Sequence, residues 1–227
     1  MAQFEWNDDV NYAGVIGLKK QNPNLKVLIS VGGWNLGSVP FSDMVTSPNN
    51  RAKFVNTTVT FLKKYNFDGL DLDWEYPGSR DGSRITDKSL FTSLISELKD
   101  AFKPFGFILT AAVGVGFSTA NLAYEIDKIS RLLDFINLMT YDLHGSWETF
   151  TGLNAPLYPR SNEVDEQRNL NIDAAVNYWL NNGATRSKLI LGLASYGRSF
   201  TLVSSTQNGL GASANGAGNS LSVIIII

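Results

Sequence analysis

The sequence contains no cysteine, one histidine and no long apolar run, and these absences remove several classes of function. Without cysteine the chain has no disulfide, no zinc–thiolate site and no thiol nucleophile. No apolar run approaches the roughly 20 residues that a membrane-spanning helix needs, so we expect no membrane partner. A formal net charge of only -2 gives no reason to expect nucleic acid as a partner. These limits leave a globular domain of ordinary hydrophobic content, 44%.

The two ends of the chain carry little that would direct it to a compartment or build a core. The first nine residues, Met-Ala-Gln-Phe-Glu-Trp-Asn-Asp-Asp, have no apolar core, so we expect no signal peptide in this segment. Residues 209–222 are rich in Gly, Ala, Asn and Ser. This composition predicts a linker that contributes no core residues.

Short β-rich apolar runs alternate with longer amphipathic ones, and this alternation predicts a parallel sheet of strand–helix–strand units. Strands are predicted over residues 26–34, 67–76, 107–115, 134–141 and 188–196, and helices over 49–66, 87–102, 122–133 and 172–180. The strands are apolar almost throughout, which predicts burial on both faces. Periodicity fits a closed (β/α) barrel and an open doubly wound sheet equally. No Gly-x-Gly-x-x-Gly turn follows the first strand, which disfavours a dinucleotide site.

Residues 68–75 read Asp-Gly-Leu-Asp-Leu-Asp-Trp-Glu and contain three acids spaced two apart. Alternate side chains of a strand share a face, so Asp71, Asp73 and Glu75 are expected to point the same way. Leu72 and Trp74 would then face the core. Three neighbouring carboxyl groups repel one another, and this raises some of their pKa values. The sequence therefore predicts a proton donor that works near neutral pH.

Polar and aromatic residues gather where the predicted strands end, and in an α/β sheet that edge carries the functional site. The pairs are Trp34-Asn35, Glu75-Tyr76 and Tyr141-Asp142. An Asp-x-Asp-x-Glu pattern can also bind a hard cation. Here the interleaved residues are apolar, and Tyr76 stands where a calcium loop needs glycine. We therefore predict no metal and no cofactor.

At this point the sequence resembles a known family. Residues 67–77, Phe-Asp-Gly-Leu-Asp-Leu-Asp-Trp-Glu-Tyr-Pro, resemble the signature strand of the family 18 glycoside hydrolases, the chitinases. Segments in the same order as in that family are Ser30-Val-Gly-Gly-Trp-Asn35, Leu138-Met-Thr-Tyr-Asp142 with His144-Gly-Ser-Trp147, and Leu191-Gly-Leu-Ala-Ser-Tyr-Gly-Arg-Ser-Phe200. Glu5-Trp6-Asn7-Asp8 also matches. The resemblance runs from Glu5 to about Gly216 and is closest to animal chitinases and chitinase-like lectins.

The resemblance implies a (β/α)8 barrel of the TIM type, of which this chain carries only strands three to seven. Residues 1–208 would form the partial catalytic barrel, and residues 209–227 the start of an inserted domain or a truncated tail. Five strands cannot close the barrel and leave two unpaired edges. The sequence therefore supports, as one interpretation, an incomplete fragment without activity of its own.

The resemblance implies retaining hydrolysis of β-1,4 N-acetylglucosamine linkages in chitin, in which the substrate's own acetamido oxygen attacks the anomeric carbon. Glu75 would be the acid and base, Asp73 would orient the acetamido group, and Asp71 would share a proton with Asp73. Tyr141 would donate to the acetamido oxygen. We expect cleavage of the endo type.

Aromatic faces and polar groups near these acids would hold the sugar rings. The predicted substrate-binding residues are Glu5, Trp6, Gly32, Gly33, Trp34, Asn35, Tyr76, Met139 and Asp142. Partners would be chitin or N-acetylglucosamine oligosaccharides, and the complete protein would be an extracellular monomer. Some relatives bind chitin oligosaccharides without cutting them and typically lack the terminal glutamate. Glu75 is present here, which favours the enzyme over the lectin.

Overall fold

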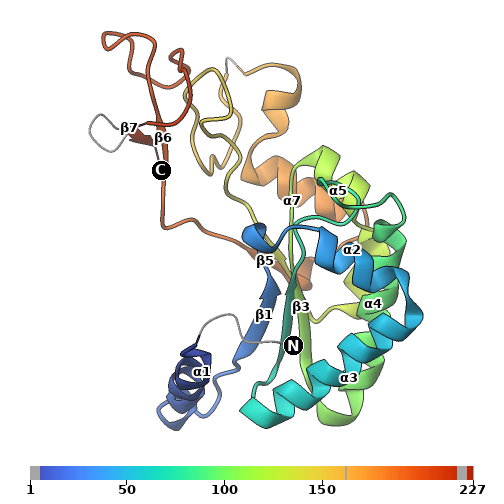
Figure 1. Cartoon of the computed structure of the whole chain (residues 1–227). Coiled ribbons are helices and arrows are strands. Elements are labelled where there is room, and N and C mark those ends of the chain that lie inside the picture. Colours follow the sequence, from blue (N-terminus) through green and yellow to red (C-terminus); the bar gives the residue numbers. More distant parts are fainter. Residues whose placement is uncertain (1–5, 162, 219–223, 227) are drawn as a thin grey trace. The chain divides into compact units, whose positions relative to one another are not determined.

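The computed structural model describes residues 6–161, 163–218 and 224–226 (Figure 1). The chain divides into two compact units, and each is described by itself. Unit 1 comprises Met1–Val113, Asn121–Asn137 and Ala184–Leu189. Unit 2 comprises Gly114–Ala120, Leu138–Gly183 and Ile190–Ile227. Within the described residues, no helix combines the length and the apolar character needed to cross a membrane.

A five-stranded sheet follows the chain order β1-β2-β3-β4-β5. Its strands are β1 (Leu28–Gly32), β2 (Gly69–Asp73), β3 (Ile108–Val113), β4 (Phe135–Leu138) and β5 (Leu189–Leu191). β1 and β2 are parallel, as are β2 and β3, and their register places Ser30, Asp71 and Thr110 in one row. All five predicted strands are present, although each is shorter than predicted.

The helices alternate with the strands as the sequence predicts. They are α1 (Asp8–Gly17), α2 (Val39–Thr46), α3 (Pro48–Tyr65), α4 (Asp87–Phe102), α5 (Phe117–Ala123), α6 (Ile126–Leu132) and α7 (Ile172–Asn181). Short 3-10 turns are η1 (Leu18–Lys20), η2 (Trp34–Leu36), η3 (Lys103–Phe105), η4 (Asp165–Asn169) and η5 (Arg186–Lys188). The single helix predicted over 122–133 is wrong, because the chain leaves helical geometry at Glu125, where ψ is 77°. The adjacent Tyr124 ring packs against Phe91 at 6.0 Å.

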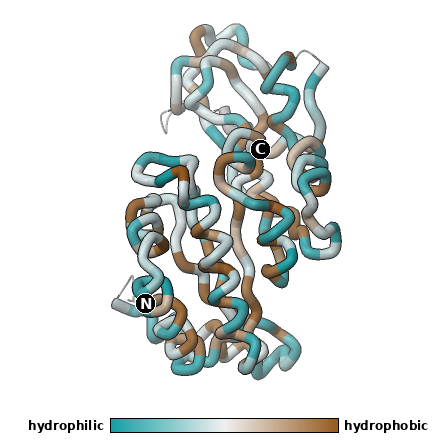
Figure 2. The backbone as a smooth tube through the Cα atoms, turned by 90° about the vertical axis from the view of Figure 1, so that its right-hand side faces the viewer, coloured by the Kyte–Doolittle hydropathy of each residue, from teal (hydrophilic) through white to brown (hydrophobic). Residues whose placement is uncertain are grey.

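The core of unit 1 lies between β2 and the helices beside it. Leu70, Leu72 and Trp74 are at most 1% exposed, so the alternate apolar residues of this segment face the core as predicted. Trp74 stacks on Phe41 of α2 at 5.2 Å and meets Phe91 of α4 edge-on at 5.8 Å. Figure 2 shows hydrophobic and hydrophilic stretches alternating along the helices, as expected when each helix buries one face.

The prediction that every strand is buried on both faces is wrong for the outer strands. Along β1 the side chains are half-buried or exposed, and in β5 Ile190 and Leu191 are 45% and 43% exposed. β1 and β5 stand at the two ends of the strand order, so each has only one neighbouring strand. The inner strands β2 and β3 contain no exposed residue, whereas the inner strand β4 begins at Phe135, which is 41% exposed.

Unit 2 contains an antiparallel pair, β6 (Arg198–Phe200) with β7 (Ile224–Ile226). The prediction that residues 209–222 contribute no core residue is wrong in the described part of this segment, residues 209–218. The N–H of Gly211 donates to the carbonyl of Thr151 at 2.8 Å, and the N–H of Thr151 donates to the carbonyl of Ala212 at 2.9 Å. Ala214 is only 3% exposed. Small side chains allow this segment to pack closely, which its composition alone did not indicate.

Helix α7 is started by a side-chain cap whose loss should be measurable. The N–H of Ala174 donates to Asn171 Oδ1 at 2.9 Å, and Asn171 is fully buried. Asn171→Ala leaves this donor without its partner, so we expect the free energy of unfolding to fall by about 1–2 kcal/mol. Thermal unfolding measures the loss. Asn177→Ala, at an exposed position on the same helix, is the matched control. An equal loss in both variants would contradict the capping role.

Candidate active site

The three predicted acids come together around the carboxyl end of β2. Asp71 and Asp73 lie in the strand on one face. Glu75 does not lie in the strand, because β2 ends at Asp73, and the predicted strand over 67–76 is too long. The chain turns at Glu75, and the Glu75–Tyr76 peptide bond is cis. Glu75 nevertheless acts electrostatically on Asp73, so its carboxyl group stays close to that of Asp73.

Asp71 is held by three neutral donors from three other strands. Ser30 Oγ of β1 donates to Asp71 Oδ2 at 2.9 Å. Thr110 Oγ1 of β3 and Asn137 Nδ2 of β4 donate to Asp71 Oδ1 at 2.5 Å and 2.9 Å. Both carboxylate oxygens are therefore already engaged by the protein.

Asp73 has the opposite environment. Its Oδ1 is buried and has no hydrogen-bond partner among the described residues. The pKa of Asp73 is raised from 3.8 to about 6, first by burial and then by the charges of Glu75 and Asp71. The group can thus change protonation near neutral pH, and it presents an acceptor that nothing described in the protein satisfies.

Tyr76 lies against Glu75, the acid that follows β2. Its hydroxyl hydrogen-bonds to the Glu75 side chain, and its pKa is raised, first by burial and then by the Glu75 charge. The sequence predicts Tyr76 as a flat surface for a sugar. In the structure it is a half-buried partner of Glu75.

The segment after β1 lies beside Asp73 because glycine permits it. Gly32 has φ of 128°, and a Cβ there would lie 1.9 Å from the backbone oxygen of Asp73. The N–H of Gly33 donates to that same oxygen at 2.8 Å. Trp34 and Asn35 follow in η2, and both are exposed. The structure therefore brings this predicted group together with Asp73.

Two predicted sugar-binding residues at the N-terminus are not joined to this group. Trp6 precedes α1 with 95% of its surface exposed, and among the described residues no hydrogen bond or ring contact links it to β2. Glu5 lies outside the described residues. Both assignments stay predictions that rest on resemblance.

The remaining predicted residues, Met139, Tyr141 and Asp142, belong to unit 2 and follow the end of β4. Arg198 Nε donates to Asp142 Oδ1 at 2.7 Å. The ring of Tyr141 meets Tyr196 edge-on at 6.1 Å. Burial, and then a hydrogen bond to Asp142, raises the pKa of Tyr196 to about 12, so this phenol remains a donor at neutral pH. Met139, which precedes Tyr141 and Asp142 in the chain, is half-buried.

Sequence reasoning missed several side chains that build the site. Those around Asp71 are Ser30, Thr110 and Asn137, and those around Glu75 are Ser38 and Arg80. Ser30, Thr110 and Asn137 are isolated polar residues inside apolar runs, which is a usable signal for a buried polar contact. Ser38 and Arg80 lie in loops, where no periodicity marks them.

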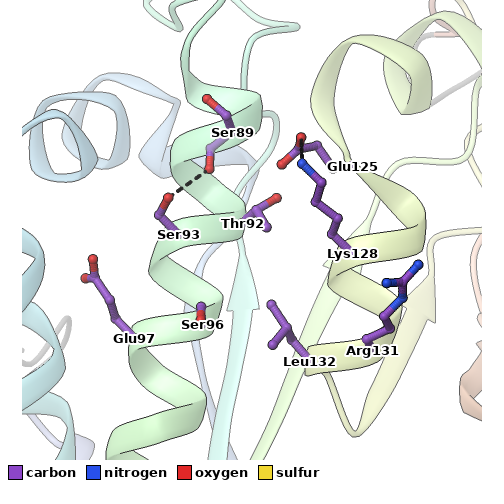
Figure 3. A pocket seen from close by; sticks show the side chains of 9 residues that line it. All are labelled: Ser89, Thr92, Ser93, Ser96, Glu97, Glu125, Lys128, Arg131 and Leu132. Atoms are coloured by element: carbon purple, nitrogen blue, oxygen red, sulfur yellow. Dashed lines mark hydrogen bonds and ion pairs between the residues drawn. The ribbon is translucent and has the colours of Figure 1, made fainter.

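A separate hollow lies on the outer side of unit 1, between α4 and α6 (Figure 3). Thr92 of α4 points toward Lys128 of α6, and Ser96 and Arg131 also line the hollow. None of the predicted site residues lines it. Among the residues that the structure describes, no group of three or more His, Cys, Asp or Glu side chains is placed to hold a metal ion.

Comparison with known proteins places this geometry in a family. Residues 1–221 match the family described as glycosyl hydrolases family 18. Mouse chitotriosidase-1 is 48% identical over 225 residues, which cover 96% of this chain and 48% of that protein. The Ostrinia furnacalis group IV chitinase, solved in complex with allosamidin, has a TM-score of 0.90 and 38% identity over 96% of this chain and 60% of that chain.

One solved relative is described as lacking the activity. Human YKL-39, reported as a pseudo-chitinase with retained chitooligosaccharide binding properties, has a TM-score of 0.88 and 36% identity. It covers 96% of this chain, which in turn covers 61% of it. This chain spans about half the length of the curated relatives that it matches. The predicted fold class, an α/β chain with part of a (β/α)8 barrel, is confirmed. The chain belongs to glycosyl hydrolase family 18.

Proposed function

We propose that this chain carries the acid–base centre of a chitin hydrolase that cleaves β-1,4 linkages between N-acetylglucosamine residues with retention. The observation that carries the proposal is Asp73, whose buried Oδ1 lacks a partner among the described residues beside Asp71 and Glu75. An amide N–H on the substrate is the kind of donor that such an oxygen needs. The names of the relatives, which include chitinases, support the same substrate class.

Each acid takes a role that suits its surroundings. Glu75, beyond the strand end, gives its proton to the glycosidic oxygen as the acetamido oxygen of the substrate attacks the anomeric carbon. The bond to the leaving sugar breaks, and an oxazolinium intermediate forms. Glu75 then takes a proton from the water that opens this intermediate. Asp73 accepts the acetamido N–H and faces the positive charge as it develops.

The contacts of Asp71 refine the role that resemblance gives it. Three donors occupy both oxygens of Asp71, whereas Asp73 Oδ1 has none among the described residues. We infer that Asp73 is the residue of this pair that holds a proton below about pH 6. Tyr141 is proposed, by resemblance, to donate its hydroxyl to the acetamido oxygen. The complete protein is proposed to be an extracellular monomer, also by resemblance.

A substrate series tests the proposal. The assisted mechanism needs the acetamido group, so N-acetylglucosamine hexamer should yield shorter oligomers, while its deacetylated counterpart and cellohexaose should yield none. Products are separated by chromatography after long incubation. Cleavage of all three hexamers would contradict the acetamido role. Saturable binding of the N-acetylated hexamer without any product would favour the lectin, as in the pseudo-chitinase relative. Neither binding nor product would favour an inactive fragment.

A further inference from the structure

We propose that Arg80 is a positioning residue that ties the indole of Trp34 to the backbone of Glu75. The side chain on which a sugar ring would stack and the carboxyl group that would protonate the bond are thereby held in one arrangement. The inference rests on the proposed function for its consequence in catalysis. Its structural part concerns three described residues of unit 1 and stands without a ligand.

The guanidinium of Arg80 makes three contacts at once. Its Nη1 donates to the carbonyl oxygen of Trp34 at 2.8 Å and to the carbonyl oxygen of Glu75 at 3.0 Å. Its central carbon lies 3.7 Å from the centroid of the Trp34 ring. A single planar group thus bridges the loop after β1 and the loop after β2 and covers one face of the indole.

The backbone at Glu75 is also held from the inside of the unit. Ser38 is 1% exposed, and its hydroxyl donates to the carbonyl of Tyr76 at 3.1 Å and to that of Glu75 at 3.3 Å. The same hydroxyl accepts from Trp74 Nε1 at 3.0 Å. The carbonyl of Glu75 therefore lies between a buried donor, Ser38, and an outer donor, Arg80.

Arginine suits this position for a physical reason. A planar guanidinium can stack on an aromatic ring and donate in its own plane, whereas a lysine ammonium is a point charge that cannot do both. Trp34 is 58% exposed although Arg80 covers one of its faces. The other face is left for a sugar ring, so Arg80 makes Trp34 a one-sided platform.

A matched control lies in the same loop. Arg84 donates through Nη1 to Ser42 Oγ at 2.8 Å and through Nη2 to Asp43. It contacts α2, and among the described residues none of its hydrogen bonds or ion pairs reaches Trp34 or Glu75. Arg84→Lys therefore changes an arginine of the same loop without touching the proposed bridge, and Arg80→Lys keeps the charge while removing the planar group.

The first measurement needs no ligand. The 227-residue chain contains five tryptophans, and 5-fluorotryptophan labelling gives each one a fluorine resonance. Trp34→Phe assigns the resonance of Trp34. We expect Arg80→Lys to shift and broaden the Trp34 resonance and to leave that of buried Trp179 in place. Arg84→Lys should move neither. An unchanged Trp34 resonance in Arg80→Lys would overturn the proposal, whatever the chain does with chitin oligomers.

The second measurement separates binding from chemistry. We expect Arg80→Lys to weaken binding of N-acetylglucosamine hexamer about five-fold through the lost stacking partner. It should lower kcat by roughly 10- to 100-fold through displacement of Glu75. Arg84→Lys should match the wild type in both. A shifted Trp34 resonance with unchanged kcat would overturn the link to Glu75. Wild-type protein that neither binds nor cleaves would instead contradict the proposed function, while the fluorine result still decides the bridge.

Discussion

Glu75→Gln is expected to lower kcat for N-acetylglucosamine oligomers by about 10²–10⁴-fold, with KM nearly unchanged. Glutamine matches the size of glutamate and can still hydrogen-bond to Tyr76, but it cannot give up a proton to the leaving oxygen. The loss should therefore appear in the chemical step rather than in binding. A chromogenic N-acetylglucosamine oligomer measures turnover, and titration of intrinsic tryptophan fluorescence measures binding.

The Glu75→Gln experiment has a control at another glutamate, and both substitutions are tested in two proteins. Glu166→Gln makes the same chemical change at an exposed position in η4 and should leave kcat unchanged. Both substitutions are made in the 227-residue chain and in a chimera whose remaining family segments come from mouse chitotriosidase-1. Wild-type turnover in the chimera that survives Glu75→Gln would show that Glu75 is not the acid.

Asp73→Asn is expected to lower activity and to raise stability. An amide cannot face the developing positive charge as a carboxylate does, so we expect kcat to fall by about 10²–10³-fold. The same substitution removes a charge from a site that disfavours it. At pH 7 to 8 we expect the free energy of unfolding to rise by about 1–2 kcal/mol, after allowance for the solvent screening of a half-exposed group.

The pH dependence of this stability gain follows from the raised pKa. Below pH 3.8 Asp73 is protonated in both the folded and the unfolded chain, so wild type and Asp73→Asn should be equally stable. Between pH 3.8 and about 6 the folded chain binds more protons at this residue than the unfolded chain does, and wild-type stability falls as pH rises. Above pH 6 the gap between the two proteins should be constant.

Calorimetric unfolding from pH 3.5 to 8 measures this gap. Asp81→Asn, at an exposed position in the loop after β2, provides a control that should track the wild type at every pH. A gap that is independent of pH would mean that the effect of Asp73→Asn is one of packing. A variant less stable than wild type at pH 8 would contradict the raised pKa.

The sequence predicts those parts of the fold that depend on periodic burial. The stripe of Leu94, Leu98 and Phe102 places α4 from Asp87 to Phe102, and alternation places Leu72 and Trp74 in the core. What alternation does not predict is where a strand stops. β2 ends at Asp73, because the chain turns at Glu75, where the side chains of Ser38 and Arg80 donate to the Glu75 carbonyl and hold it.

The candidate site also has a part that the sequence predicts and a part that it does not. The three acids stand out in the sequence because they are spaced two apart. The difference in hydrogen bonding between Asp71 and Asp73 does not stand out in the sequence, because it depends on donors that are remote in the chain. Asn137 reaches Asp71 across 66 residues of sequence, and no comparable donor among the described residues reaches Asp73 Oδ1. Only the register of the strands decides which carboxyl group is satisfied.

The row that joins Ser30, Asp71 and Thr110 has a consequence for assembly of the sheet. A slip of one residue between β1 and β2, or between β2 and β3, would turn one partner to the opposite face. Asp71 would then be a half-buried carboxyl group with fewer hydrogen-bond donors, which destabilises a compact state. Sheets with the wrong register are thus disfavoured, so the hydrogen bonds of Asp71 help to select the native register of β1, β2 and β3 as the chain folds.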